Sequence, residues 1–247
     1  MKITSVNNNL VKETAKLLQR KYRDESELFL IEGEKCIEEA IISGIELTNV
    51  FVMEGYEKFS KFNPIETTEA VLSKISSTSS APKAIAVGKK LKTQWSKNFN
   101  KVVLLENIKD AGNLGTILRT SAAFGIDAII LFGDTVDLYN PKCVRSSVGN
   151  LWKIPVFSEI SDIDWLKDNF KDFEIIATLP KSKNTVLLED YKPSPKVLVM
   201  FGTESDGLSE GLKSLATKNI TIEMSKNVES LNLSISAGII LYRIRNL

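Results

Sequence analysis

The sequence predicts an α/β protein with a parallel sheet in its C-terminal part and a smaller α/β domain before it. After residue 100, apolar residues form short continuous runs, among them Ala128–Phe132 and Val197–Phe201. Such runs are typical of strands that are buried on both faces of a parallel sheet. Segments with helical spacing separate the runs, and this alternation predicts helices that cover the sheet.

The N-terminal part shows the same alternation on a smaller scale. Leu10, Leu17, Leu18 and Tyr22 lie at roughly helical spacing and predict a basic amphipathic helix over residues 10–23. The further elements expected here are a strand at 28–31, a helix at 34–42 that stops at Gly44, a strand at 50–53, a helix at 68–75 and a strand at 84–87.

Residues 88–100 are polar, basic and weakly patterned, which is typical of a linker. We place the linker at 93–100, between a domain of residues 1–92 and a domain of residues 101–247. In the second domain we expect strands at 102–105, 128–132, 154–157, 174–178, 197–201 and 219–224, and helices at 114–124, 141–147, 160–169, 208–215 and from residue 231 onward. Ligands of such sheets bind beyond the carboxyl ends of the strands. The loops in which we expect a site are therefore 106–113, 179–184, 202–207 and 224–231.

Composition excludes several classes of protein. Hydrophobic residues make up 43% of the 247 residues, which is enough for a packed core. The chain has no histidine, so histidine-based triads and HExxH zinc sites are excluded, and Cys36 and Cys143 form no CxxC site. No apolar run is long enough to span a bilayer, and residues 1–9 lack the apolar region of a signal peptide. We therefore expect a cytoplasmic protein with no metal and no membrane partner.

The charges of the N-terminal part lie in blocks. Residues 1–23 and 70–101 are basic, whereas residues 24–69 are strongly acidic. The basic blocks predict a stripe that faces RNA phosphates. Its candidate contacts are Lys12, Lys21 and Arg23. The alternative is that the blocks are solvated helix faces and a soluble linker.

The common nucleotide-binding signatures are missing, because the chain contains neither GxGxxG nor GK[ST]. Instead, the expected strand at 102–105 leads into a polar loop and a helix. Asn113 is expected to cap this helix, whose first-turn amides can face an anion. Arg119 lies mid-helix, where its planar guanidinium can point into a cleft. The alternative is a capped helix with a surface arginine.

Two later loops are rich in groups that bind ligands. Gly202 and Gly207 bound a polar loop after a buried strand, where the backbone can approach a ligand closely. Within this loop, Glu204 can bind a hydroxyl or cap the next helix. The start of the last helix carries more polar side chains than one cap needs, namely Ser230, Asn232, Ser234 and Ser236. This surplus indicates ligand contacts or tight helix packing.

These segments carry a specific family resemblance. NLGTILRTSAAFG at 113–125, FGTESDGL at 201–208 and IEMSKNVESLNLSISAGI at 222–239 resemble motifs 1, 2 and 3 of the SpoU (TrmH-like) family of RNA 2′-O-ribose methyltransferases. NPKCVRSSVGNLWKIP at 140–155 resembles a further family segment. Residues 3–33 resemble the family's RNA substrate-binding domain, so the resemblance covers nearly the whole chain.

The resemblance implies a fold, a methyl donor and partners. The fold is an α/β catalytic domain with a trefoil knot, the donor is S-adenosylmethionine, the substrate is RNA, and the active form is a homodimer. It implies that Gly202, Ile222 and Leu231 contact S-adenosylmethionine. The residues that match the family's catalytic and substrate-positioning set are Asn113, Arg119, Glu204, Ser230 and Asn232, and those expected to touch RNA are Arg145 and Ser146.

The implied reaction moves a methyl group from a sulfonium to a ribose 2′-hydroxyl. It needs alignment of the reacting atoms and removal of one proton, and it needs no metal. By the resemblance, the N-terminal domain favours 23S ribosomal RNA over transfer RNA. Two other interpretations stay open, namely a non-catalytic RNA-binding or ribosome assembly protein and a metabolite-binding α/β protein. One departure from the family pattern is the absence of a proline near Ala111 or Gly112.

Overall fold

The computed structural model of the chain describes residues 1–203, 205–225, 227–228 and 230–245. The chain divides into two compact units. The first unit contains Met1–Lys92 and Asp137–Lys153, and the second contains Thr93–Val136 together with the described residues from Ile154 onward. The chain therefore passes from one unit to the other three times.

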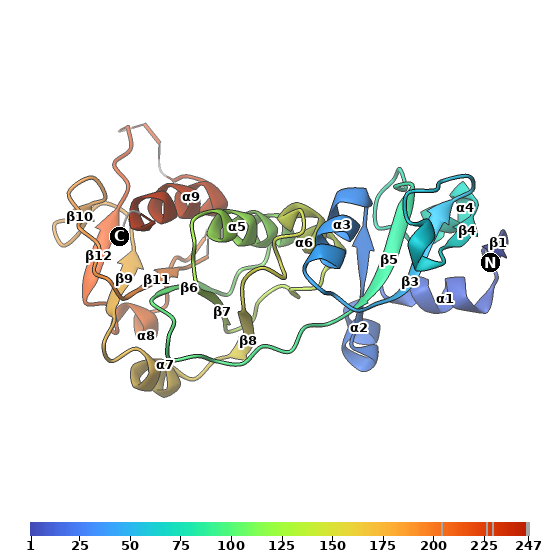
Figure 1. Ribbon diagram of the computed structural model, residues 1–247. Helices are drawn as coiled ribbons and strands as arrows, with labels where there is room; N and C mark the ends of the chain where they lie inside the picture. Colours follow the sequence, from blue (N-terminus) through green and yellow to red (C-terminus); the bar gives the residue numbers. More distant parts are fainter. Residues whose placement is uncertain (204, 226, 229, 246–247) are drawn as a thin grey trace. The chain divides into compact units, whose positions relative to one another are not determined.

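The second unit is built on a seven-stranded sheet in which all paired strands are parallel (Figure 1). In sheet order the strands are β10 (Val186–Leu187), β12 (Lys218–Thr221), β9 (Glu174–Thr178), β11 (Val197–Phe201), β6 (Lys101–Glu106), β7 (Ala128–Phe132) and β8 (Val156–Ile160). Every residue of β7 and β11 is buried, as their continuous apolar runs predict. The predicted parallel sheet is thus confirmed.

The helices of this unit begin at side-chain caps. They are α5 (Ala111–Ala123), α7 (Ile163–Asn169), α8 (Glu210–Lys213) and α9 (Leu233–Ile244). Asn232 caps α9 and accepts from the backbone N–H groups of Ser234 and Ile235. The cap of α5 is Asp110, whose carboxylate accepts from the Asn113 N–H. The prediction that Asn113 caps this helix is therefore wrong, because Asp110 starts it earlier and leaves Asn113 in the first turn.

The predicted linker is packed against the second unit by aromatic contacts. The ring of Trp95 meets those of Phe157 and Trp165 edge-on, with centroids 5.1 Å apart in each pair, and that of Phe170 at 5.5 Å. Edge-to-face aromatic pairs add to the free energy gained by burying the rings. Trp95 thus fixes this segment to the sheet layer.

The first unit holds a five-stranded mixed sheet. In sheet order its strands are β1 (Lys2–Ile3), β4 (Ile65–Thr67), β3 (Leu47–Met53), β5 (Ala84–Lys89) and β2 (Leu28–Glu32), and its helices are α1 (Asn9–Lys16), α2 (Arg20–Ser26), α3 (Glu34–Ile42), α4 (Glu69–Ile75) and α6 (Pro141–Ser147), with a 3₁₀ turn, η1 (Ser60–Phe62). Strand β5 is antiparallel to both β2 and β3, whereas β1, β4 and β3 pair in parallel. The sequence missed β1 and β4, which are too short for a periodic pattern.

The single helix expected over residues 10–23 is wrong, because the chain turns between α1 and α2. The N–H groups of Leu17, Leu18 and Gln19 bond three residues back, and this tightens the end of α1. The freed carbonyl of Leu17 accepts from the guanidinium of Arg23 at 2.7 Å. A tertiary contact thus stabilises the turn that the sequence pattern did not show.

Residues 137–153, expected within the second domain, pack with the first unit. Arg23 is 2% exposed and forms an ion pair with Asp137, at 2.5 Å between the guanidinium and the carboxylate. Arg145 pairs with the buried carboxylate of Glu32 at 3.3 Å. The ring of Tyr139 lies 4.7 Å from that of Phe29. The segment therefore belongs to the core of the first unit.

No helix in the described ranges is both long enough and apolar enough to cross a bilayer.

Candidate S-adenosylmethionine site

A cavity of about 370 Å³ lies at the carboxyl ends of β12, β9 and β11. These three strands are parallel neighbours, so their ends meet at one edge of the sheet. The start of α9 supplies the remaining wall. The lining comes from residues 178–180, 201–203, 205–208, 221–222, 224, 230–231 and 233 and from three further side chains, Lys213, Ser236 and Ile240. Three of the four loops in which the sequence predicts a site thus form it.

Gly202 stands where no side chain fits. A Cβ at this position would lie 2.0 Å from the carbonyl carbon of Gly207 and 2.2 Å from the backbone nitrogen of Leu208. The backbone comes this close because Thr203 and Gly207 exchange two hydrogen bonds of 3.1 Å, which close a tight loop. The loop after β11 therefore presents backbone to the cavity at Gly202.

Side chains hold this loop in place. The Thr203 hydroxyl accepts from the Asp206 N–H at 2.9 Å. At the end of the loop, the buried carboxylate of Glu106 accepts from the Ser209 N–H at 2.7 Å. No role for Glu106 was predicted from the sequence. The signal available was a carboxylate directly after the apolar run Val102–Leu105.

The predicted cofactor residues lie together. Gly202, Ile222 and Leu231 all line the cavity, although Gly202 lies in the loop after β11 and the other two lie in the loop between β12 and α9. Leu179 and Ile240 add apolar surface, and the sequence did not single out either residue. Lys213 and Asp206 bring charges of opposite sign to the wall, and Lys213 also pairs with Glu210 at 2.9 Å.

Motifs 1 and 3 meet through two of the predicted catalytic residues. The side-chain amide of Asn232 donates to Oδ1 of Asn113 at 3.0 Å. Asn232 directly precedes α9, and residues 230, 231 and 233 on either side of it line the cavity. The hydrogen bond therefore places the first turn of α5 beside the cavity. Ser230 lines the cavity itself, whereas Glu204 lies outside the described residues.

Arg119 is exposed on α5 and does not line the cavity. Among the residues that the structure describes, none forms an ion pair or hydrogen bond with its guanidinium. Helix α5 packs on α9, and the Cβ position at Gly238 lies 3.8 Å from Cγ2 of Thr120. This packing fixes the helix that carries Arg119 and leaves the guanidinium in solvent.

The candidate RNA contacts fall into two groups. Lys12 and Lys21 are exposed on α1 and α2, and Lys21 lies 3.8 Å from Glu25. Arg145 is partly exposed and bound to Glu32, and the neighbouring Ser146 is half-buried. The inclusion of Arg23 was wrong, because Asp137 and the Leu17 carbonyl take up its donors inside the core.

The comparisons with known proteins decide the family. The family model described as the SpoU rRNA Methylase family matches residues 100–242. This chain belongs to the SpoU family. The model of the MRM3-like substrate binding domain matches residues 8–86 of the same SpoU chain.

Relatives match the SpoU chain over nearly its full length. It is 32% identical to an uncharacterized tRNA/rRNA methyltransferase of Synechocystis, over 98% of this chain and 93% of the relative. It is 29% identical to the 23S rRNA (guanosine(2553)-2′-O)-methyltransferase RlmP of Bacillus subtilis, over 98% of each chain. An AdoMet-bound rRNA methyltransferase from Sinorhizobium meliloti has a similar structure, with a TM-score of 0.88, 27% identity, and coverage of 100% of this chain and 97% of the other.

Proposed function

We propose that this SpoU chain transfers a methyl group from S-adenosylmethionine to a ribose 2′-hydroxyl of 23S ribosomal RNA. The observation that carries the proposal is the Asn232–Asn113 hydrogen bond, which joins motifs 1 and 3 beside a cavity formed largely by motifs 2 and 3. The names of relatives support the substrate. RlmP of Bacillus subtilis acts on 23S rRNA, and the Sinorhizobium meliloti protein is an AdoMet-bound rRNA methyltransferase.

The cavity fits the proposed cofactor. Its volume of about 370 Å³ lies within the range of about 300–1,000 Å³ that is common for small-molecule sites. Leu179, Ile222 and Leu231 offer apolar surface to an adenine ring, and Gly202 offers backbone at close range. Lys213 and Asp206 suit the carboxylate and the amine of the amino-acid end. When bound, the cofactor supplies an electrophilic methyl group on a sulfonium. Among the described residues, no cluster of His, Cys, Asp and Glu suits a metal ion.

The residues of the chain then orient the ribose and move one proton. Asn113, Ser230 and Asn232 offer neutral hydrogen-bonding groups that can align a hydroxyl. A guanidinium keeps its proton at physiological pH, so Arg119 is a poor base. We propose instead that Arg119 binds an RNA backbone phosphate and stabilises the developing alkoxide. Glu204, water or phosphate then relays the proton of the 2′-hydroxyl.

RNA recognition is assigned to the N-terminal domain, for which we keep the proposed bounds 1–92. A linker at 93–100 and a methyltransferase domain at 101–247 follow, and residues 137–153 of the latter pack with the first unit. The match to a substrate binding domain over residues 8–86 supports this division. The exposed Lys12 and Lys21 bind RNA phosphates. Arg145 and Ser146, in the segment that packs with the first unit, also contact the RNA. We place the enzyme in the cytoplasm, with its substrate.

The active form proposed is a homodimer whose catalytic domain carries a trefoil knot. Exposed apolar side chains on α9 support the dimer: Ile235 is 54% exposed, Ile239 39% and Tyr242 52%. Their spacing of four and three residues puts them on one helix face, and a second copy of the chain would bury this stripe. The knot rests on the resemblance of the three motifs to the family.

The experiment that tests the proposed substrate uses the purified full chain and S-adenosylmethionine with a labelled methyl group. Undermethylated total RNA from a strain that lacks the gene is the acceptor, and the RNA is then separated by size. We expect label in 23S rRNA. Label in transfer RNA alone would show that the enzyme acts on transfer RNA and not on 23S rRNA. No label in any RNA would favour a non-catalytic RNA-binding or assembly protein.

A further inference from the structure

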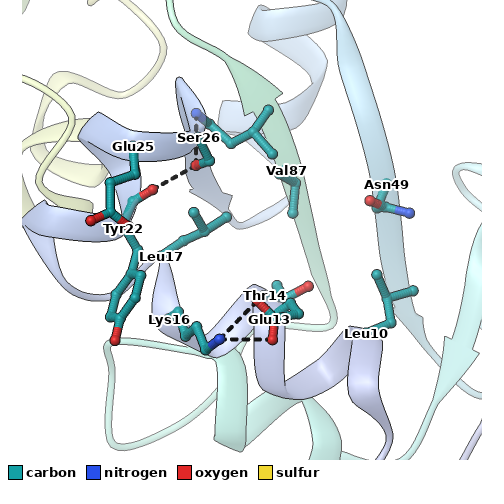
Figure 2. A pocket seen from close by; sticks show the side chains of 11 residues that line it. Leu10, Glu13, Thr14, Lys16, Leu17, Tyr22, Glu25, Ser26, Asn49 and Val87 are labelled. Carbon is teal, nitrogen blue, oxygen red and sulfur yellow. Dashed lines mark hydrogen bonds and ion pairs between the residues drawn. The ribbon is translucent and has the colours of Figure 1, made fainter.

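The first unit contains a second pocket, far along the chain from the cofactor motifs. It has a volume of about 380 Å³ and opens between the helices α1 and α2 and the sheet strands β2, β3 and β5 (Figure 2). Apolar side chains contribute much of its lining, namely Leu10, Leu17, Leu28 and Val87. The proposed methyl transfer does not use this pocket. Residues 10–49 of its lining lie within the match to the substrate binding domain, which names no contact residues.

Asn49 is a half-buried polar residue in β3, two positions before the core residue Phe51. It stands directly opposite Val87 in the sheet, and Val87 is 3% exposed in the hydrophobic core. Phe51, two residues further along β3, is fully buried in the same core. The pairing register shifts between Leu47 and Asn49, and such irregularities often redirect a side chain at a functional site. Within the described part of the chain, the Asn49 amide makes no hydrogen bond, and it lines the pocket.

Thr14 offers a second polar group with no partner. The residue is 4% exposed and lines the same pocket. Its hydroxyl takes part in none of the hydrogen bonds among the described residues. Because Thr14 lines the pocket, its hydroxyl is available to a ligand there. Figure 2 shows Thr14 on α1 and Asn49 on the strand side of the pocket.

The rim of the pocket carries an aromatic ring with cations over it. The ring of Tyr22 has the ammonium of Lys16 at 5.5 Å from its centroid and that of Lys21 at 5.8 Å. Lys16 also bonds to Glu13 at 2.8 Å and Lys21 lies 3.8 Å from Glu25, and both carboxylates belong to the lining of the pocket. An aromatic face beside cations is the arrangement with which proteins bind an unstacked base and its adjoining phosphate.

We propose that this pocket binds one unstacked nucleobase of the ribosomal RNA substrate, away from the nucleotide that is methylated. The base lies on the apolar floor against Tyr22, its edge bonds to Asn49 and Thr14, and its phosphate faces Lys16 and Lys21. A peptide side chain fits less well, because the ring of Tyr22 suits the face of a planar base and the side chains of Asn49 and Thr14 suit its edge. This proposal rests on the proposed function, in which the substrate of the enzyme is RNA.

The test compares three variants of the full-length enzyme: Asn49→Leu, Thr14→Val and the matched control Thr48→Val. Leucine suits the apolar side of β3, and valine has nearly the shape of threonine, so both pocket variants keep the fold. Thr48 is exposed and precedes Asn49 on the same strand. For each protein, KM and kcat are measured with 23S rRNA from a strain that lacks the gene, and S-adenosylmethionine binding is measured separately.

We expect Asn49→Leu to raise KM for the rRNA about tenfold and Thr14→Val about threefold. Changes of this size are typical of the loss of one neutral hydrogen bond. kcat and cofactor binding stay at the wild-type level. The slope of RNA affinity against salt concentration also stays unchanged, because neither variant removes a charge. Thr48→Val behaves as the wild type. Unchanged KM in both pocket variants would overturn the proposal, and so would equal losses in Thr48→Val.

A cross-linking measurement identifies the occupant. The wild type is irradiated with rRNA that contains 4-thiouridine or 6-thioguanosine, and the linked peptide is found by mass spectrometry. We expect cross-links to residues 10–28. Cross-links confined to other segments would contradict the base pocket, even if methyl transfer to rRNA is normal. If the wild type methylates no RNA at all, the proposed function fails, and direct binding of the same rRNA to the two variants still tests the pocket.

Discussion

Asn232 donates a 3.0 Å hydrogen bond to Asn113, and the same asparagine caps α9 through its side-chain oxygen. One side chain thus has two functions that belong to different atoms. Oδ1 accepts from the backbone of α9 and stabilises the helix. Nδ2 joins the helix to motif 1 and so orders the proposed catalytic groups.

The two functions can be separated by substitution. Asn232→Asp keeps the capping oxygen and removes the amide donor, so we expect near-normal thermal stability and at least a tenfold loss of kcat. Asn232→Ala loses both functions and in addition about 1 kcal/mol of stability, the usual cost of a lost cap. Thermal unfolding and methyl-transfer rates on both variants check this. Normal turnover in Asn232→Asp would show that the amide donor of Asn232 plays no part in catalysis.

Gly202 tests the shape of the cavity. In Gly202→Ala the new Cβ meets backbone atoms of Gly207 and Leu208, which cannot move without opening the loop. We expect S-adenosylmethionine affinity to fall at least tenfold, measured by titration calorimetry. The matched control is Gly238→Ala, where the new Cβ meets only Cγ2 of Thr120 at 3.8 Å. The control keeps its affinity, and equal affinity in Gly202→Ala would contradict the proposed location of the cofactor.

Arg119 tests the chemistry. Lysine keeps the charge of this residue and loses the planar guanidinium. Because Arg119 does not line the cavity, Arg119→Lys is expected to bind S-adenosylmethionine normally and to lose turnover by more than tenfold. Single-turnover rates with saturating rRNA measure this effect. Near-normal rates would rule out any need for the planar group.

The sequence predicted more of the second unit than of the first. The strands at 128–132 and 197–201 were placed correctly because a strand buried on both faces must be apolar throughout. The break between α1 and α2 depends on Arg23, whose partners Leu17 and Asp137 include one more than a hundred residues away. No local pattern encodes such a contact.

The candidate site shows the same division. Gly202, Ile222 and Leu231 were named from motif resemblance, and the parallel sheet brings their loops to one edge. The assignment of residues 137–153 to the first unit could not be predicted, because it rests on long-range pairs such as Glu32 with Arg145. The sequence pattern of a segment predicts its helices and strands. The unit against which the segment packs depends on tertiary contacts, which the pattern does not contain.

Glu174 predicts how stability depends on pH. Burial alone would raise its pKa, but hydrogen bonds from Lys218, Tyr191 and the Ser194 N–H outweigh this and lower the pKa below its usual value. A lowered pKa in the folded state adds stability above the unfolded-state value of about 4.3. This stability is lost as the pH falls through the lower folded-state value. In urea unfolding, Glu174→Gln should therefore be less stable than the wild type at pH 7, and the gap should narrow as the pH falls below the unfolded-state value. A gap that is constant with pH would contradict the assignment.

The exposed stripe on α9 predicts the oligomeric state. A glutamate in place of Ile239 puts an unpaired charge into the proposed interface, so we expect Ile239→Glu to convert dimers to monomers in light scattering after size exclusion. The matched control is Ile42→Glu on α3, because Ile42 is 78% exposed on the other unit. A monomeric wild type, or a dimeric Ile239→Glu protein, would remove α9 from the interface.

The position of the methyl group tests the central claim most directly. Ribosomal RNA from a strain that lacks the gene is incubated with the wild-type enzyme and S-adenosylmethionine, and is then hydrolysed with alkali. A methyl group on a ribose 2′-oxygen blocks cleavage of the neighbouring phosphodiester bond. We predict one new alkali-resistant position in 23S rRNA, and none after incubation with Arg119→Ala. Label on a base, with every phosphodiester bond still cleaved, would contradict the account.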